Sequence, residues 1–429
     1  MALLLDRAGA HVFVSESSGR EAKGGEADVL DNARIPSEFG GHSDRVFKSD
    51  VWVVSPGIPI SSPWIRKAMD KDIPVVGELE AASWFCRAPM VAVTGSNGKS
   101  TTTALLGELF KASRRPCVVA GNIGDPFSKY ADSLAPEGVA VLEVSSFQLE
   151  TIREFHPRVA VYLNLTPDHL NRHGTLDEYG RLKARIFENQ EADDVVVFNV
   201  LDERVADSVR AARSRKLAFG VKDDRSLAGW IADGRLIIDV GRRSEILLPI
   251  PDVGIQGEHN MANVLAAALA ARVMDVPMRT LRNVLRRFRG LPHRMETVRT
   301  IDGVQWVNDS KATNTDSVWY ALGSYDGPIV WIAGGRDKDS DFTVLADRVR
   351  EKTKAIVLIG EAASKMEKAF AHLKPISRVS SLQDAVEQAR RLARPGDVVL
   401  LSPACASFDM FRDFEDRGER FRSMVEKLR

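Results

Sequence analysis

The sequence has few cysteines, no long apolar run and no excess of charge of either sign. Its three cysteines, Cys86, Cys117 and Cys405, are widely separated, so they form neither a disulfide framework nor a Cys-x-x-Cys metal site. No run of about 18 apolar residues is present, and no basic region precedes the first apolar stretch, which meets charge at Asp6. These absences predict a cytoplasmic protein without a membrane span or a signal peptide.

The balance of charge also limits the possible partners. Lys and Arg together number 59, and Asp and Glu together also number 59. This balance excludes a broadly basic nucleic-acid-binding protein, whose affinity would come from neutralising phosphates. It does not exclude a local basic pocket for a small anion. We therefore expect no nucleic-acid and no membrane partner, and we expect a monomer.

The chain carries the pattern of a multidomain α/β protein, and its 429 residues exceed what one hydrophobic core usually supports. Short apolar runs alternate with helical stretches, which is typical of βα units and parallel sheets. A new strand starts near residues 86–89, and a basic helix ends in Arg289-Gly-Leu-Pro292, where Gly and Pro stop a helix. We predict three domains, at residues 1–87, 88–290 and 291–429.

The predicted strands are short and apolar. We expect strands at residues 11–15, 51–54, 90–93, 139–144, 159–163, 195–198, 304–307, 329–333, 355–359 and 398–401. We expect helices at residues 100–112, 176–189, 260–274, 382–393 and 414–428. Residues 216–251 read as short strands and turns, so an antiparallel patch is expected beside the main sheet.

The strongest local motif is Thr94-Gly-Ser-Asn-Gly-Lys-Ser-Thr101, which follows a predicted strand and opens a predicted helix. Glycines let backbone N–H groups turn toward an anion, and the helix N-terminus adds positive potential. Lys99 can then reach the terminal phosphates of a nucleotide, and the Ser100 hydroxyl can ligate Mg²⁺. The spacing is shorter than in the usual phosphate loop, so we interpret it as a variant. The alternative is a Gly-rich turn with a capping serine.

Polar residues follow the next strands. Glu143 ends an apolar run and is either a metal-holding acid or a solvated strand end, and the polar run from Ser145 favours the first reading. His169 is either a metal ligand or a polar loop residue. Lys183 lies one helical turn from Tyr179, so it is directed partly inward or is a surface lysine whose head group reaches solvent.

The last third of the chain adds further candidates. Asn260 and Asn263 are three residues apart, so both amides can address one ligand, although Asn260 can equally be a helix cap. Four polar islands then follow predicted strand ends, where α/β sheets place their ligands. They are His293-Arg294, residues 308–314, residues 334–339 and residues 402–411.

Seven motifs in fixed order give the chain its resemblance to a known family. They are Thr94-Gly-Ser-Asn-Gly-Lys-Ser-Thr101, Glu143-Val-Ser-Ser-Phe-Gln-Leu-Glu150, Asn164-Leu-Thr-Pro-Asp-His169, Gly257-x-His-Asn-x-x-Asn263, Leu291-Pro-His-Arg-Met-Glu296, Asn308-Asp-Ser-Lys-Ala-Thr313 and Leu401-Ser-Pro-Ala-Cys-Ala-Ser-Phe-Asp409. Together they resemble the Mur ligase family. The Asp-Asn-Pro-Arg motif of the diaminopimelate-adding members is absent, so the resemblance is to the D-glutamate-adding members.

The resemblance implies a fold and a reaction. The fold would comprise a truncated N-terminal Rossmann-like domain for the uridine nucleotide, a central ATPase domain of the phosphate-loop type, and a C-terminal Rossmann-like domain for the amino acid. ATP would phosphorylate the carboxylate of UDP-N-acetylmuramoyl-L-alanine, and the amine of D-glutamate would attack the resulting acyl phosphate. Two Mg²⁺ ions would assist. The alternatives are a folylpolyglutamate synthase-like ligase and a nucleotide-binding protein without catalysis.

The resemblance also implies residue roles. The ATP-binding residues would be Gly95, Ser96, Asn97, Gly98, Lys99, Ser100, Thr101, Asn260, Asn263, Arg294, Asp309 and Lys311. Ser100 and Glu143 would hold one metal ion, and His169 and a carbamylated Lys183 the other; Lys99, Glu143, His169 and Lys183 would be catalytic. Ser15, Ser55, Gly57, Asn122 and Ser145 would bind the muramoyl nucleotide, and Thr313, Lys338, Ser407 and Phe414 would bind D-glutamate.

The N-terminus departs from the family pattern. Family members begin with a strand and a Gly-rich loop that holds the uridine diphosphate, whereas residues 2–8 read as the end of a helix. We expect the strands at residues 11–15 and 51–54 to border an unfilled place in the sheet. We also expect an upstream start in the native reading frame. The 429-residue form should then bind the uridine substrate weakly, with reduced stability but normal ATP binding.

Overall fold

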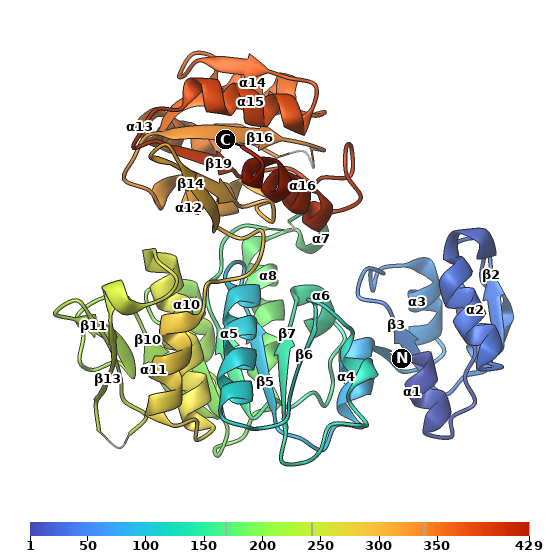
Figure 1. Cartoon of the computed structure of the whole chain (residues 1–429). Helices are drawn as coiled ribbons and strands as arrows, with labels where there is room; N and C mark the ends of the chain where they lie inside the picture. The colour runs from blue at the N-terminus through green and yellow to red at the C-terminus, as the bar shows by residue number, and fades with distance from the viewer. Residues whose placement is uncertain (169, 242, 338–339, 429) are drawn as a thin grey trace. The chain divides into compact units, whose positions relative to one another are not determined.

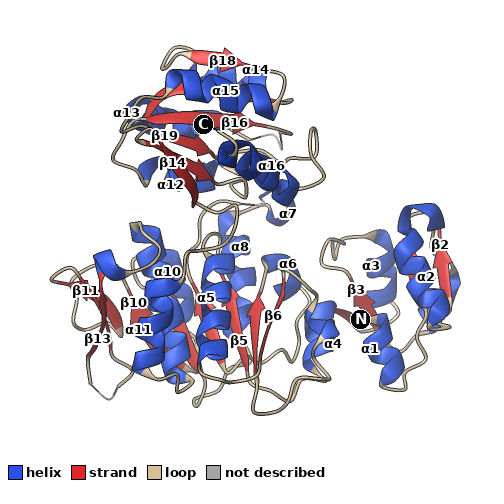
Figure 2. Ribbon diagram, in the orientation of Figure 1, coloured by secondary structure: helices blue, strands red, loops and turns tan. Residues whose placement is uncertain are grey.

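The computed structural model describes residues 1–168, 170–241, 243–337 and 340–428 (Figure 1). Helices alternate with strands over most of this length (Figure 2), and the α/β class predicted from the sequence is confirmed. The chain divides into two compact units, Met1–Asp252 with Met261–Arg286, and Val253–Asn260 with Arg287–Arg429. Each unit is described by itself. The two boundaries between the three predicted domains stay predictions.

The first unit is built on a nine-stranded sheet with the order β13-β12-β11-β10-β9-β8-β5-β7-β6. Its strands are β5 (Met90–Thr94), β6 (Cys117–Gly121), β7 (Val139–Glu143), β8 (Val159–Tyr162), β9 (Val195–Asn199), β10 (Arg215–Phe219), β11 (Gly229–Ala232), β12 (Arg235–Ile238) and β13 (Glu245–Pro249). Strands β5 and β7 are buried along their whole length, as expected for apolar strands of a parallel sheet that helices cover on both faces.

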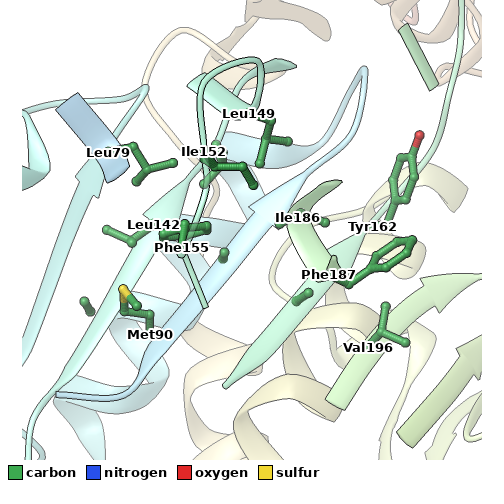
Figure 3. Packing of buried hydrophobic residues seen from close by; sticks show 14 of the residues in the cluster. Leu79, Met90, Leu142, Leu149, Ile152, Phe155, Tyr162, Ile186, Phe187 and Val196 are labelled. Carbon is green, nitrogen blue, oxygen red and sulfur yellow. The ribbon is translucent and has the colours of Figure 1, made fainter. Parts of the chain in front are cut away.

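Helices connect and cover these strands. They are α5 (Lys99–Ala112), α6 (Ser146–Leu149), α7 (Leu170–His173), α8 (Leu176–Ala184), α9 (Glu203–Val209), α10 (Glu258–Val273) and α11 (Met278–Arg287). Figure 3 shows the core beside the sheet, where Leu142, Tyr162 and Val196 of three strands meet Ile152 and Ile186 from the connecting segments. This buried apolar layer fixes the strand ends that carry the polar motifs.

The helix predicted at residues 176–189 and the predicted antiparallel patch differ from the structure in detail. Helix α8 ends at Ala184, five residues before the predicted end, and continues as a short 3-10 helix, Arg185–Phe187. The Arg185 guanidinium donates to the backbone oxygens of Leu149, Glu150 and Ile152, which holds this turn against the segment after β7. Strands β12 and β13 pair antiparallel, as predicted, but they extend the main sheet through β11 and form no separate patch.

The N-terminal segment of the first unit contains two small parallel sheets. Its elements are α1 (Ala2–Arg7), β1 (Val14–Glu16), α2 (Gly24–Asn32), β2 (Ser37–Phe39), β3 (Trp52–Val54), α3 (Pro63–Met69), β4 (Val75–Gly77) and α4 (Glu78–Ser83). Strand β1 pairs with β2, and β3 pairs with β4. In the described residues no ladder joins β1 to β3. Strand β1 starts three residues later than predicted because its ladder with β2 begins at Val14.

The second unit has a six-stranded sheet with the order β14-β15-β19-β16-β17-β18, in which only the pair β14–β15 is antiparallel in the described residues. Its strands are β14 (Glu296–Ile301), β15 (Val304–Asn308), β16 (Ile329–Gly334), β17 (Thr353–Ile359), β18 (Ile376–Arg378) and β19 (Val398–Leu401). Its helices are α12 (Thr315–Gly323), α13 (Ala346–Lys352), α14 (Ala363–Phe370), α15 (Leu382–Leu392) and α16 (Phe414–Glu426). None of the helices in the described part of the chain has both the length and the apolar character of a membrane span.

A buried carboxylate ties helix α4 to the segment that follows α6. The side chain of Glu80 is fully buried. It accepts backbone N–H bonds from Arg153, Glu154 and Phe155, each at 2.9 Å, and an indole N–H bond from Trp84 at 3.0 Å. Removing this carboxylate leaves the buried N–H of Phe155 and three partly buried donors without this acceptor.

We therefore expect Glu80→Ala to lower the free energy of unfolding by about 2–4 kcal/mol. Chemical denaturation of the full chain measures this change. Glu108→Ala is the matched control, because Glu108 is exposed on α5 and pairs only with exposed Lys111 among the contacts described, a type of pair worth about 0–1 kcal/mol. Equal stability losses in the two variants would contradict the proposed role of Glu80.

Candidate active site

The phosphate-loop motif forms the turn between β5 and α5. Gly98, the residue before α5, has φ +82°, a left-handed conformation that favours glycine. A Cβ atom there would lie 2.3 Å from Oδ1 of Asn263, a buried residue of α10. Glycine therefore allows both the turn and the close approach of α10, and two segments predicted to bind nucleotide meet at this point.

A second loop holds the phosphate loop in place. The backbone N–H of Asn97 donates to Oδ1 of Asn164 at 2.8 Å, and the Asn164 amide donates back to the Asn97 oxygen at 3.1 Å. The Ser96 hydroxyl donates to the backbone oxygen of Thr166 at 2.8 Å and accepts the Thr166 N–H at 2.9 Å. These reciprocal bonds join the loops after β5 and β8 into one rigid structure.

Two lysines converge on the backbone of the phosphate loop. Nζ of Lys99 donates to the oxygens of Gly95 and Ser96, both at 2.8 Å. Nζ of Lys183, from α8, donates to the same Gly95 oxygen at 2.8 Å. Lys183 is only 1% exposed and lies over the ring of Tyr179, so it is an interior lysine. The reading of Lys183 as a surface lysine was wrong.

Burial changes the chemistry of Lys183. Loss of hydration, together with the nearby Lys99 cation, lowers the pKa of the Lys183 amine well below its ordinary value, although Asp168 and Glu143 oppose this shift. Burial disfavours the charged form of an amine. A lowered pKa increases the fraction of the amine that is neutral and nucleophilic.

An acid lies beside the phosphate loop. Glu143 ends β7, pairs in register with Val93 of β5, and is 2% exposed. The side-chain amide of Asn122 donates to Oε1 of Glu143 at 2.8 Å, so a predicted substrate residue meets a predicted metal ligand. Ser145 caps α6 instead of projecting freely: its hydroxyl accepts from the Gln148 N–H, and the Gln148 side chain accepts from the Ser145 N–H.

The donor atoms at this edge of the sheet suit magnesium. The Glu143 carboxylate and the Ser100 hydroxyl are buried side chains with oxygen donors, and Mg²⁺ prefers such ligands together with waters and substrate phosphates. Within the described residues no group of three or more His, Cys, Asp or Glu side chains could hold a metal ion by itself. His169, a predicted metal ligand, lies outside the described residues.

The predicted uridine-site residues lie in the N-terminal segment. Ser15, in β1, donates its hydroxyl hydrogen to Oε1 of Glu38 and lies 2.7 Å from Nδ1 of His42. Ser55 begins a turn whose oxygen accepts the N–H of Ile58, and this turn contains Gly57. The small polar cluster around Ser15 was not predicted.

Five predicted residues of the second unit, Asp309, Lys311, Thr313, Ser407 and Phe414, follow β15 or β19 or start α16, whereas Arg294 precedes β14. Nζ of Lys311 lies 5.2 Å from the ring centre of Phe414, and the Thr313 N–H donates to the Lys311 oxygen. Ser407 is buried in the loop after β19, and its oxygen accepts the N–H of Phe411. Lys338, predicted to bind D-glutamate, lies outside the described residues.

Asp309 follows β15 and is buried. It accepts hydrogen bonds from the Ser402 hydroxyl at 2.8 Å and from the Met295 N–H at 3.2 Å. Burial raises the pKa of Asp309 to about 7, although the Ser402 hydrogen bond and the Arg294 cation act in the opposite direction. The folded protein therefore holds a proton on this carboxyl more tightly than the unfolded chain does.

This difference predicts a pH-dependent stability. The stabilisation from the protonated carboxyl is fully present below about pH 4 and is lost as the pH rises through about 7. Asp309→Asn stays neutral, so its stability relative to the natural chain should improve by up to about 4 kcal/mol from low to neutral pH. Denaturation at pH 4, 5.5, 7 and 8 measures this. The same pH dependence in both proteins would contradict it.

Asn260 and its neighbour His259 lie in the first turn of α10. Asn260 lies in the first turn of the helix, and its side chain donates to the Gln256 oxygen at 2.8 Å, so it is not the residue before the helix that a cap would require. Within the second unit the neighbouring His259 ring packs near the Tyr320 ring, and burial with the Arg294 cation lowers the pKa of His259 to about 4. His259 is therefore neutral at pH 7.

Three residues of these surroundings were not singled out from the sequence. His173 stacks on Tyr179 and lies 3.0 Å from the Ser146 hydroxyl. Asn164 holds the phosphate loop. Arg417, fully buried in α16, donates to Ser310 and to the Cys405 oxygen, which connects two motifs of the second unit. Position within a recognised motif was the available signal for Asn164, whereas no spacing rule identifies Arg417.

Comparison with known proteins decides the family. Residues 1–63 match the model of the MurD N-terminal domain, residues 93–271 the Mur ligase middle domain, and residues 293–405 the Mur ligase glutamate ligase domain. The chain belongs to the Mur ligase family. The resemblance inferred from seven motifs is thereby confirmed.

Individual Mur ligases and related proteins show how near the similarity is. The chain is 46% identical to UDP-N-acetylmuramoylalanine–D-glutamate ligase of Salinibacter ruber, over 100% of this chain and 95% of that protein. It is 43% identical to the enzyme of the same name from Pelotomaculum thermopropionicum, over 99% and 94%. The solved structure of E. coli FolC with DHPP and ADP has a TM-score of 0.61, 16% identity, and coverage of 82% and 93%. That likeness shows the fold alone.

Proposed function

We propose that this chain is an ATP-dependent ligase that joins D-glutamate to UDP-N-acetylmuramoyl-L-alanine in cytoplasmic peptidoglycan precursor synthesis. The observation that carries the proposal is the convergence of Lys99 and Lys183 on the Gly95 oxygen of a phosphate loop beside Glu143. Full-length identity of 46% to a ligase of that name supports the choice of substrates. The FolC structure, at 16% identity, shows the fold alone and so gives the folylpolyglutamate alternative no comparable support.

The proposed reaction has two chemical steps. A carboxylate oxygen of the alanyl group attacks the γ-phosphorus of ATP, which forms an acyl phosphate and releases ADP. The D-glutamate amine then attacks the acyl carbon, loses a proton, and expels inorganic phosphate to leave the amide. Phosphoryl transfer depends on positioning and charge neutralisation, which the Lys99 cation and the N-terminus of α5 supply to the phosphates.

Mg²⁺ fits the oxygen donors beside this loop. We propose that Ser100 and Glu143 hold one ion, and that His169 and a carbamylated Lys183 hold a second. Bound there, the ions would neutralise charge that develops on the transferring phosphoryl group. Asn122 keeps the Glu143 carboxylate oriented through its 2.8 Å hydrogen bond. The lowered pKa of Lys183 supports carbamylation, because carbamate forms from a neutral amine.

The remaining predicted residues keep their proposed roles. Gly95 through Thr101, with Asn260, Asn263, Arg294, Asp309 and Lys311, would contact ATP. Ser15, Ser55, Gly57, Asn122 and Ser145 would contact the muramoyl nucleotide, and Thr313, Lys338, Ser407 and Phe414 would contact D-glutamate. For Ser145 the capping role in α6 limits its hydroxyl to a secondary contact.

Phosphate release tests the proposed function. The full chain is incubated with Mg²⁺-ATP, UDP-N-acetylmuramoyl-L-alanine and D-glutamate, and each substrate is omitted in turn. We expect sustained phosphate release only with all three, and little release when L-glutamate replaces D-glutamate. Release that depends on a reduced folate and glutamate, without the muramoyl nucleotide, would instead establish the alternative function.

A further inference from the structure

Arg172 joins segments that are far apart in the sequence. It lies in α7, and its side chain is only 15% exposed. Nη1 donates to the oxygen of Gly57 and Nη2 to the oxygen of Ile58, both at 3.2 Å. Nη2 also lies 2.5 Å from Oε2 of Glu150, which is 17% exposed. One guanidinium therefore binds a turn of the N-terminal segment and an acid that follows α6.

The surroundings hold this guanidinium in one orientation. It lies over the ring of Phe147 at 5.0 Å from the ring centre, and Glu150 neutralises it at low exposure. A planar guanidinium donates in fixed directions, which suits binding two neighbouring carbonyls and a carboxylate together. Lysine offers a single ammonium and cannot reproduce that geometry.

The partners of Arg172 all belong to motifs with other roles. Gly57 and Ile58 come from the turn that starts at Ser55, and Phe147 and Glu150 come from the segment that follows Glu143. The turn itself is exposed, with Ile58 44% exposed, and it is held internally by the bond from the Ile58 N–H to the Ser55 oxygen. Two bonds from a partly buried arginine fix such a turn more firmly than solvent would.

We infer that Arg172 is a positioning residue that fixes the Ser55–Ile58 turn for binding of the muramoyl nucleotide. The inference rests on the proposed function, in which this turn contacts that substrate. Arg172 acts through the backbone of the turn and touches neither ATP nor D-glutamate in this account. Its loss should therefore weaken binding of one substrate selectively.

Steady-state kinetics of the full chain tests the inference. Arg172→Ala should raise the KM for UDP-N-acetylmuramoyl-L-alanine by about tenfold or more, with the KM values for ATP and D-glutamate changed less than about twofold. Arg172→Lys should give an intermediate value, and Glu150→Gln a smaller increase in the same KM. Arg204→Ala is the matched control, because Arg204 makes an exposed ion pair with Asp177 in the same unit. An unchanged KM, or equal rises in all three, would overturn the inference.

Hydrogen exchange separates this inference from the proposed function. In Arg172→Ala the amides of residues 55–58 should exchange about tenfold faster than in the natural chain, because the turn loses its two anchoring bonds. Exchange in Arg204→Ala should stay unchanged in that segment. Unchanged exchange in Arg172→Ala would overturn the tether even if ligation occurs. Faster exchange in a chain that does not ligate would support the tether and reject the proposed function.

Discussion

Replacing Lys183 with alanine is expected to lower turnover by at least about a hundredfold, the scale on which loss of an electrostatic stabiliser acts. The Lys183 amine is buried and its pKa is lowered. It donates to the Gly95 oxygen, to which Lys99 also donates. Carbamylation adds CO₂ to the neutral nitrogen and releases one proton, which converts the neutral amine into an anion. Such an anion suits a metal-rich site better than a second buried ammonium does.

If Lys183 is carbamylated, the loss of activity in Lys183→Ala should be partly reversible by an added carboxylate. Added acetate or another short carboxylate should restore part of the activity of Lys183→Ala, because it can occupy the space of the lost carbamate. Lys216→Ala is the matched control: Lys216 is an exposed lysine of β10 that donates to the Ala212 oxygen, and we expect near-normal turnover from it with no effect of acetate. Full activity of the natural chain in CO₂-free buffer, together with an unmodified Lys183 by mass spectrometry, would refute carbamylation.

The second large effect concerns Lys99. Its Nζ lies within 2.8 Å of the Gly95 and Ser96 oxygens at the start of α5, where the helix N-terminus favours negative charge. If Lys99 neutralises charge between the β- and γ-phosphates, Lys99→Ala should lower turnover by at least about a hundredfold even at saturating ATP. Rapid-quench or steady-state kinetics measures this loss.

Two observations would distinguish the role of Lys99 from loss of folding. Lys111→Ala, on the same helix and paired with exposed Glu108, should keep normal turnover. The melting temperatures of the two variants should agree within a few degrees, because the Gly95 oxygen keeps its bond from Lys183 and both bonds of Lys99 are only partly buried. Near-normal turnover of Lys99→Ala at saturating ATP would rule out the assignment.

The sequence predicts the elements of this fold well where apolar runs are short and strongly bounded. Strands β5 and β19 lie within one residue of the predicted ranges, because continuous apolar runs between turns have few other stable arrangements. The start of β1 and the end of α8 differ by several residues from the predicted positions. Both ends are set by partners distant in sequence, namely β2 and the carbonyls bound by Arg185, which no local pattern contains.

The candidate site, like the fold, could be predicted where neighbouring residues determine it and not where distant residues do. The glycine-rich turn at Gly98 was predicted, because a Gly-rich motif between a strand and a helix forms such a turn from neighbouring residues alone. The hydrogen bonds between Ser96 and Thr166 were not predicted, since they join residues 70 positions apart. Ser145 illustrates a signal that was present and unused: Ser-x-x-Gln at the start of a helix is a capping box. For Lys183 only the family resemblance favoured an active role.

If this chain makes an amide through an acyl phosphate, one carboxylate oxygen of the muramoyl nucleotide must leave with the released phosphate. UDP-N-acetylmuramoyl-L-alanine that carries ¹⁸O in both carboxylate oxygens is incubated with the full chain, Mg²⁺-ATP and D-glutamate. Mass spectrometry then measures the ¹⁸O content of the released phosphate and of the amide product. We expect one ¹⁸O in the released phosphate and one in the new amide carbonyl. Phosphate without ¹⁸O, or no D-glutamate-containing product, would contradict this expectation.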